Sequence, residues 1–503
     1  MKMMTLIKII YPRALLALIA GIFMTAQAGA ADDVTARALK LYEKHYYEEA
    51  ARLLRPELAK MEGSRQAEAS LALGMIYLGS AQVYAELHKT ALLAELDYLT
   101  RLSRQRTGSS RFADFYLGQT LLEAGRLNEA GNYLQRYANK IGAKSPFKPY
   151  ADIELGIVYS RQKQQQQAMQ AWSRLDLSKP EFKAALAGAY AVTGGQGRKA
   201  LAMADAALSE AKAQRYTPGM RMTRNLLRAY SREAAPDKAL DLLYASELNQ
   251  ASYTEEIGAS KSIRFYDASL LQDLARTHLH AAVQYLQQAG RDAKLGGSAS
   301  YYLADAYLQL GNAEAALRAD ASVLAQAQMP AQYTERARIH QASAQYMAGQ
   351  RKQAVLAWQS LAEKSAAEPP LLAAVMQACA RAGADCATIE TLALAAVEKG
   401  EGKKIFPLNA ALGKYYLQKK DYPKALLYME AGRDKAYKNK IEVNDPEMLI
   451  GLAEAYYRNK KYSENLEIYF EIGKQYPVVR QIQEAMQGIY SLEQQSAGDV
   501  KIF

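Results

Sequence analysis

Residues 115–134 read FYLGQTLLEAGRLNEAGNYL, and residues 411–429 read ALGKYYLQKKDYPKALLYM. In both stretches a glycine is followed twelve residues later by an alanine. The same offset joins small residues along the whole chain: Gly118/Ala130, Gly156/Ala168, Gly188/Ala200, Gly413/Ala425, Ala38/Ala50, Ala304/Ala316 and Ala342/Ala354. A sequence motif that recurs in this way predicts an all-α helical solenoid. Proteins of this fold class mostly bind other molecules.

The small residues have a packing role. Two helices of one unit approach closely only where side chains are small, so glycine or alanine is expected at the contact. Large residues such as Leu117, Tyr159 and Trp172 would fill the space between neighbouring helices. One helix pair cannot bury its apolar face alone, so the units must stack.

The motif resembles the signature of the tetratricopeptide repeat family, in which Leu-Gly-x-x-Tyr is followed by alanine and then by a large apolar residue. Leu155-Gly156 with Tyr159, Ala168 and Trp172 is the fullest match. The resemblance covers nearly all of the chain after residue 30. It implies a right-handed superhelical solenoid of about 11–12 antiparallel helix pairs, some of them degenerate, and it leaves the partner open.

Several positions depart from the repeat. Asn465 stands where an alanine is expected, and Asp320 stands where a large apolar residue is expected. The polar segment 250–262 carries little pattern and is a candidate boundary. We therefore expect an N-terminal solenoid half over residues 31–250 and a C-terminal half over residues 262–495.

The first thirty residues have the features of a secretory signal peptide. Lys2, Lys8 and Arg13 form a basic flank, Leu15 to Met24 is a short apolar core, and Ala28-Gly29-Ala30 fits a cleavage site. The alternative, a transmembrane anchor, requires a longer apolar run. We expect cleavage after Ala30 and a periplasmic protein with no transmembrane segment after cleavage, an exported bacterial member of the family.

The charge of the chain bears on its partners. Loss of the three basic residues of the signal peptide lowers the formal net charge from +11 to +8. For an exported protein this balance favours an acidic protein or peptide, an anionic polysaccharide or lipid headgroups, and not nucleic acid. A basic surface with no partner is the alternative, because electrostatic steering requires clustered charge.

The two cysteines, Cys379 and Cys386, are separated by a predicted helix end, Gly383 and a predicted helix start. In an oxidising compartment a disulfide between them would fasten a degenerate unit. The alternative is a pair of buried thiols. No histidine is near enough in sequence to suggest a metal site.

No catalytic constellation is found, and no cofactor is expected. His278 and His280 are two residues apart, so on one helix they point to different faces and cannot share a metal. The glycines of residues 194–200 lack the phosphate-loop spacing. The sequence therefore predicts a protein that is not an enzyme.

The sharpest local feature is a basic stripe. Arg221, Arg224, Arg228 and Arg232 recur at the spacing of one helix face, with Asn225 beside them. In the family the first helix of each unit lines the concave groove, and these positions resemble those that clamp a peptide carboxylate. Guanidinium groups also bind carboxylates bidentately on general grounds. Internal ion pairs with Asp237 and Glu233 are the alternative.

Tyrosine is abundant, with 35 residues against 9 phenylalanines. Tyr150, Tyr301, Tyr346 and Tyr457 are expected at groove-facing positions, where tyrosine suits a peptide or sugar surface. Core packing is the alternative for each of them. Two functions follow. The first is a non-catalytic periplasmic scaffold that holds a protein partner in envelope assembly, secretion or pilus biogenesis. The second is an accessory of exopolysaccharide export that contacts anionic polymer or a synthase–porin complex.

Overall fold

The computed structural model of the chain describes residues 34–104, 110–141, 145, 147–246, 253–256, 262–265, 268–400 and 402–499. These residues are almost entirely helical, so the all-α expectation is confirmed. One short hairpin was not expected: β1 (Tyr253–Glu256) pairs antiparallel with β2 (Ser262–Phe265), within the segment proposed as a boundary. Among the described residues no helix combines the length and the apolar character needed to cross a membrane.

The chain groups into two compact units. The first takes its described residues from Met1–Gly79 and Ala282–Asn465, and the second from Ser80–Ala281 and Leu466–Phe503. The boundaries fall within three helices: α4 (Gly63–Arg104), α13 (Ala268–Ala289) and α23 (Tyr462–Ile472).

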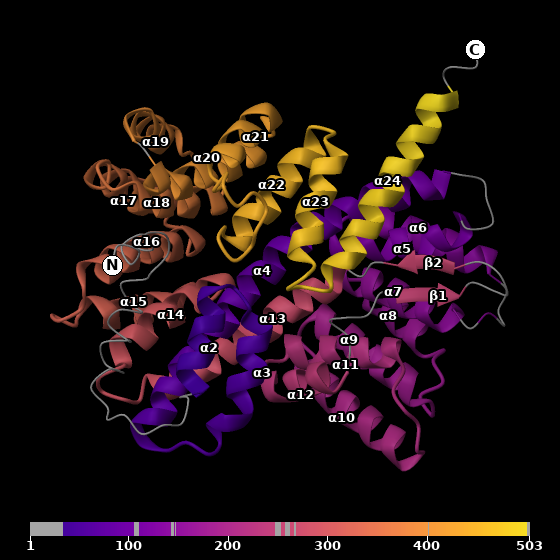
Figure 1. Cartoon of the computed structure of the whole chain (residues 1–503). Coiled ribbons are helices and arrows are strands. Elements are labelled where there is room, and N and C mark those ends of the chain that lie inside the picture. The colour runs from indigo at the N-terminus through magenta and orange to yellow at the C-terminus, as the bar shows by residue number, and fades with distance from the viewer. Residues whose placement is uncertain are drawn as a thin grey trace. The chain divides into compact units, whose positions relative to one another are not determined.

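The first unit is built from successive antiparallel pairs, which Figure 1 shows for α14 to α21. Besides its shares of the three boundary helices, it contains a 3-10 turn, η1 (Gly402–Ile405), and these helices: α2 (Val34–Glu43), α3 (Tyr47–Leu58), α14 (Gly296–Gln309), α15 (Ala313–Leu324), α16 (Ala331–Met347), α17 (Arg351–Lys364), α18 (Pro369–Arg381), α19 (Ala387–Lys399), α20 (Phe406–Gln418), α21 (Tyr422–Ala431) and α22 (Pro446–Arg458).

The second unit has the same construction. It contains the hairpin, its shares of the boundary helices, and these helices: α5 (Ser110–Glu123), α6 (Leu127–Lys140), α7 (Lys148–Arg161), α8 (Gln165–Trp172), α9 (Pro180–Thr193), α10 (Gly197–Ala213), α11 (Met220–Arg232), α12 (Pro236–Ala245) and α24 (Val479–Asp499). The long helices α4, α13 and α24 stand outside the alternation of paired helices.

The repeated small residues lie at the helix contacts, as expected. A Cβ atom added at Gly118 would lie 2.6 Å from Leu134 Cγ, and one added at Gly413 would lie 2.6 Å from Met429 Cγ. At Gly156 it would overlap the indole of Trp172. In each pair the large side chain comes four residues after the anchor alanine. Close helix contact therefore requires the glycine, because any side chain there would displace its partner.

The departures from the repeat are accommodated locally. Asn465 is fully buried, and its Nδ2 donates a hydrogen bond of 2.7 Å to the carbonyl oxygen of Ala453, across the α22–α23 contact. The long gap after Ala342 contains the pair α18–α19, whose helices are joined by the disulfide Cys379–Cys386. Between α12 and α14 the described residues form β1, β2 and α13, so a hairpin and one long helix interrupt the succession of helix pairs.

The compact units differ from the expected halves, 31–250 and 262–495. Contacts between distant parts of the chain explain the difference. In the second unit Arg101 Nη2 of α4 lies 3.1 Å from Glu493 Oε1 of α24. In the first unit Tyr46 Oη donates a hydrogen bond of 2.7 Å to Glu442 Oε1. The expected signal peptide, residues 1–30, lies outside the described residues.

Candidate functional site

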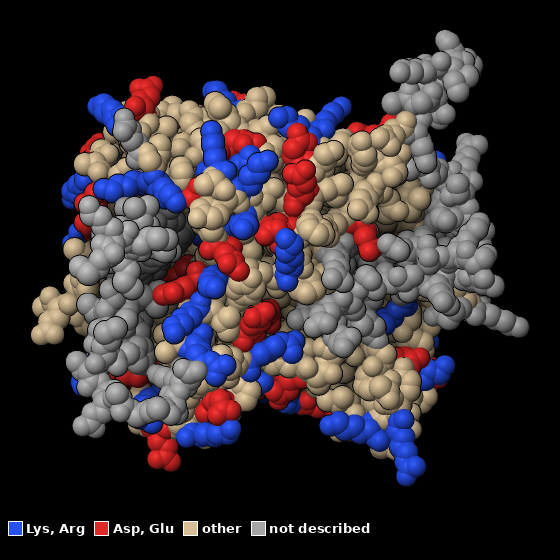
Figure 2. All heavy atoms as spheres, viewed as in Figure 1, with Lys and Arg blue, Asp and Glu red and all other residues tan. Residues whose placement is uncertain are grey.

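On the face shown in Figure 2, basic and acidic side chains are interspersed over most of the described surface. A dense cluster of ion-paired side chains lies inside the second unit. It forms where α11 meets the first turns of α13.

Three arginines of the predicted stripe converge on one carboxylate. Arg224 Nη1 donates to Asp273 Oδ2 at 2.8 Å, and Arg232 Nε donates to Asp273 Oδ1 at 3.1 Å. Arg228 Nε lies 3.6 Å from Asp273 Oδ2, and its Nη2 donates to Ser269 Oγ at 2.7 Å. Ser269 Oγ also accepts from Arg224. Since Asp273 is fully buried, this cluster is part of the interior of the unit.

The arginines set the ionisation of Asp273. Burial by itself would raise the pKa of this carboxyl, but the charges of Arg232, Arg224 and Arg228 outweigh burial and lower the pKa to about 2. Asp273 is therefore ionised at any physiological pH. It neutralises part of the positive charge that the stripe brings into the unit.

The other two residues of the predicted site are held differently. The guanidinium of Arg221 stacks over the ring of Tyr150, 4.2 Å from its centroid. Asn225 Nδ2 donates a hydrogen bond of 3.0 Å to the carbonyl oxygen of Arg221, and its Oδ1 would lie 3.1 Å from a Cβ atom at Gly188. Arg221 is thus a stacking residue, and Asn225 fills the contact between successive helix pairs.

The expected geometry of the stripe needs correction. The five residues do lie on one helix, α11, but the side chain of Arg224 is only 5% exposed. The stripe faces α13, and the observed partner of Arg224, Arg228 and Arg232 is Asp273. The alternative predicted from the sequence was an ion pair with Asp237 or Glu233, which follow the stripe directly. The observed partner, Asp273, lies 41 residues after Arg232.

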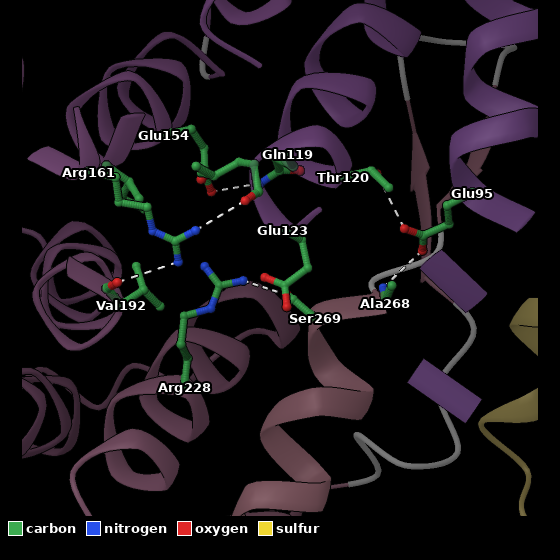
Figure 3. Close-up of a pocket in the computed structure, with 12 residues that line it drawn as sticks. Glu95, Gln119, Thr120, Glu123, Glu154, Arg161, Val192, Arg228, Ala268 and Ser269 are labelled. Atoms are coloured by element: carbon green, nitrogen blue, oxygen red, sulfur yellow. Dashed lines mark hydrogen bonds between the residues drawn. The ribbon is translucent and has the colours of Figure 1, made fainter. Parts of the chain in front are cut away.

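A small recess of about 30 Å³, lined by both polar and apolar groups, opens beside this cluster (Figure 3). It is lined from α4, α5, α7, α9, α11 and α13, so four of its walls are first helices of successive pairs. Its charged lining residues are Glu95, Glu123, Glu154, Arg161 and Arg228. The recess therefore combines both signs of charge in a partly enclosed space.

One of these charges is structural. Glu95 Oε1 accepts a hydrogen bond of 2.9 Å from the backbone N–H of Ala268, the first residue of α13. Its Oε2 accepts from Thr120 Oγ1 at 3.3 Å. A carboxylate at a helix N-terminus satisfies a free amide and complements the helix dipole. Glu95 thus fixes the start of α13, which carries Ser269 and Asp273.

Arg161 is held by backbone carbonyl oxygens of the neighbouring helices. Its Nη1 and Nη2 donate to the carbonyl oxygens of Leu122 at 3.1 Å and Val192 at 3.4 Å. Burial lowers the pKa of Arg161, the nearby charges of Arg232 and Arg228 lower it further, and Glu123 opposes them. In Figure 3 the guanidinium groups of Arg161 and Arg228 approach the middle of the recess from two sides.

Glu123 supplies the opposite charge. Its Oε1 lies 3.4 Å from His88 Nε2, and neither atom has a hydrogen-bond partner among the described residues. Burial pushes the pKa of Glu123 up, whereas His88 and the charge of Arg232 push it down, and the net pKa is below its ordinary value. Arg228 Nε and Gln119 Oε1 are also buried without a hydrogen-bond partner in the described part of the chain.

The recess offers hydrogen-bond donors and acceptors of both charges, which suits recognition of a polar group. Within the described ranges no cluster of His, Cys, Asp and Glu could hold a metal ion. Glu123 and Arg161 were not among the residues predicted from the sequence. Each looks like an ordinary surface charge within its own repeat, and only the stacking of repeats brings them together.

The expected groove-facing tyrosines are distributed differently. Tyr301 is buried and packs edge-on against Tyr333 with ring centroids 5.0 Å apart, so core packing, the alternative for these tyrosines, holds for it. Tyr150, Tyr346 and Tyr457 are half-buried. His278 is buried beside Ser80, with His278 Nδ1 3.0 Å from Ser80 Oγ.

No protein-family model matches the chain, and no curated protein matches its sequence. Solved structures with a similar fold include yeast Tom70, at 11% identity over 93% of this chain and 95% of that chain, with a TM-score of 0.31. A tetratricopeptide repeat protein from Parabacteroides merdae matches at 14% identity over 69% of this chain and 100% of that chain, with a TM-score of 0.27. The tetratricopeptide-like, all-α architecture stands on the helix pairs and anchor contacts described above.

Proposed function

We propose that the chain is a non-catalytic scaffold of the bacterial cell envelope that binds an acidic segment of a protein partner at the recess of the second unit. The observation that carries this proposal is the pair of guanidinium groups, Arg161 and Arg228, that face one open recess. In an array of helix pairs, the face formed by successive first helices is the natural place for an extended partner.

The chemistry of the recess supports a carboxylate-bearing partner. Arg161 donates to two neutral carbonyl oxygens, and Arg228 shares Asp273 with two other arginines. A carboxylate of the partner placed between them would receive charge-assisted hydrogen bonds in a partly desolvated site. Glu123 Oε1 would accept a backbone N–H of the same segment, which would fix its direction.

Two features support the envelope location. The sequence of residues 1–30 has the organisation of a cleavable signal peptide. The disulfide between Cys379 and Cys386 is of a kind that persists in an oxidising compartment. Together they favour a periplasmic scaffold in assembly, secretion or pilus biogenesis.

The test is affinity capture from a cell-envelope lysate with the chain beginning at residue 31, followed by binding measurements on the enriched protein. Arg161→Gln should weaken that binding at least about tenfold, since it removes a charged hydrogen bond. Arg161→Lys keeps the charge and should retain part of it. Arg174→Gln is the matched control, because Arg174 of the same unit is exposed and lies outside the recess.

Equal binding by Arg161→Gln and the control would reject the recess as the site. Hydrogen exchange of α7 and α9 checks that the variant keeps its fold. Retention of glycan instead of protein, lost in the same variant, would favour the accessory role in polysaccharide export.

A further inference from the structure

The connection between α21 and α22, residues 432–445, stands apart from the other connections of the first unit. Its fourteen residues, GRDKAYKNKIEVND, contrast with the short link of residues 365–368 between α17 and α18. Long ordered connections in compact domains are often functional. We refer to residues 432–445 as the lysine loop.

The lysine loop is held by its own buried polar groups. Asn444 Oδ1 accepts from the backbone N–H of Asp434 at 2.8 Å, and Asn444 Nδ2 donates to the carbonyl oxygens of Lys438 at 2.7 Å and Lys440 at 3.2 Å. Asp434 and Asn444 are both buried, and Ile441 anchors the loop in the interior. The loop is therefore a fixed frame from which its other side chains project.

Every acidic residue of the loop has a partner within the chain. Asp434 pairs with Lys403 of η1, and Glu442 accepts a hydrogen bond from Tyr46 Oη. Asp445 Oδ1 caps α22 by accepting from the backbone N–H of Glu447 at 2.9 Å. Lys403 neutralises Asp434, whereas Glu442 and Asp445 are held by neutral donors and keep their charge.

The lysines are not compensated in this way. Lys435, Lys438 and Lys440 are exposed, and no ion pair joins them to a carboxylate of the described residues. The same holds for Lys404 of η1, which the Lys403–Asp434 pair brings to the same edge. Lysine, unlike arginine, presents a mobile point charge without a fixed planar geometry.

Two apolar side chains stand among these lysines. Tyr437 is 46% exposed and Val443 is 40% exposed. Lys440 Nζ lies 6.0 Å from the ring centroid of Tyr437. Exposed tyrosine and aliphatic groups within a basic cluster match the chemistry of a membrane interface, where the ring lies at headgroup level and the ammonium groups meet lipid phosphates. A soluble anionic polymer would engage the lysines and leave Val443 without a role.

We propose that the lysine loop docks on the surface of an anionic lipid bilayer, with Tyr437 and Val443 inserted at headgroup level. A lysine near an anionic membrane strengthens binding about fivefold, and the attraction falls off within a Debye length. Lys435, Lys438 and Lys440 together therefore account for about 100-fold in partition coefficient. This docking would keep the protein, and with it the recess of the second unit, close to a membrane.

The test is co-sedimentation of the chain beginning at residue 31 with vesicles of phosphatidylglycerol and phosphatidylethanolamine, and with vesicles of phosphatidylcholine alone. The triple variant Lys435→Gln/Lys438→Gln/Lys440→Gln should lose about 100-fold in partition onto the anionic vesicles. The matched control Lys352→Gln/Lys364→Gln/Lys460→Gln removes the same charge from exposed lysines elsewhere in the first unit, and it should lose less than about fivefold.

The salt dependence and the apolar side chains give independent readouts. Binding should weaken steeply between about 0.1 M and about 1 M salt. Val443→Ser, which keeps every charge, should weaken binding severalfold at either salt concentration. An equal loss in both triple variants would reduce the effect to net charge and overturn the proposal. Binding to alginate without binding to anionic vesicles would also overturn it and assign the loop to an acidic polymer.

Discussion

Asp273 of the second unit and Asp320 of the first unit are both completely buried, yet their surroundings are opposite. Asp273 lies among three arginines at 2.8 to 3.6 Å. Asp320 has one neighbouring base, His340, whose Nδ1 lies 3.5 Å from Asp320 Oδ1. Neither oxygen of Asp320 has a hydrogen-bond partner among the described residues.

The two carboxyls respond to burial in opposite directions. The pKa of Asp273 is lowered to about 2. The pKa of Asp320 is raised, chiefly because burial disfavours its charged form and His340 opposes this only in part. A fully buried aspartate can therefore stabilise or destabilise the fold. The charged groups around it decide which.

Replacing Asp273 should have the largest effect. Asp273→Asn leaves three guanidinium groups buried without their counter-charge, so the free energy of unfolding should fall by about 3–5 kcal/mol. Urea denaturation, with hydrogen exchange of α11 and α13 to locate the loss, measures this. Asp205→Asn is the control, because Asp205 is half-exposed and pairs with exposed Lys238, and its loss should stay below about 1 kcal/mol. Equal losses would contradict the role of the cluster.

Lowering the pH should reproduce part of that loss of stability in the wild-type protein. The folded pKa of Asp273 lies below the ordinary value of 3.8, so its stabilisation is present above pH 3.8 and is lost as the pH falls through about 2. The expected loss is about 2.5 kcal/mol, measured by urea denaturation at several pH values. Asp273→Asn should lack this contribution, and an identical acid profile in both proteins would refute the assignment.

Removing one arginine should cost less than removing the shared carboxylate. Arg232→Gln deletes the hydrogen bond to Asp273 Oδ1 but leaves Arg224 and Arg228 in place. We expect a loss of about 2 kcal/mol by urea denaturation. Arg318→Gln serves as the control, since Arg318 and its partner Glu314 are exposed and their pair contributes less than about 1 kcal/mol. A loss as large as that of Asp273→Asn would mean that the three arginines act as one unit.

Asp320→Asn should change stability in the other direction. The folded pKa of Asp320 lies above 3.8, so its contribution is favourable at low pH and is lost as the pH rises through the folded pKa. A neutral amide removes the buried charge and should raise the free energy of unfolding at pH 7 by on the order of 1 kcal/mol. Glu398→Gln, at an exposed site in the same unit, should change it very little. A destabilised Asp320→Asn would show that the ionised carboxylate is needed.

The features that could be predicted from the sequence depend on regular spacing between residues that are close together in the chain. The anchors at Gly118, Gly156 and Gly413 were predictable because helix contact repeats at a fixed offset. The pairing of Cys379 with Cys386 was predictable because one turn separates two helices. These features depend only on residues close together in the chain.

The partner of the arginine stripe was not predictable from such regularity, because the hairpin and the start of α13 intervene. A weak signal existed: Asp273 is the only acidic residue in the sequence from Ala268 to Ala289. A single acid at such a position indicates a buried cationic partner. The recess had no signal at all, since Glu123 comes from α5, Glu154 and Arg161 from α7, and Arg228 from α11.

The contact between α4 and α24 has a consequence for biogenesis. In an ordinary solenoid each repeat touches only its neighbours, so the array can fold from its N-terminus as the ribosome delivers it. Here Arg101 pairs with Glu493, 392 residues later, and Tyr46 pairs with Glu442, 396 residues later. The first unit therefore gains this contact only after Glu442 has been synthesised, and the second only after Glu493 has been synthesised. In a nascent or truncated chain the early repeats lack these contacts. The polypeptide therefore stays accessible to chaperones for most of its synthesis.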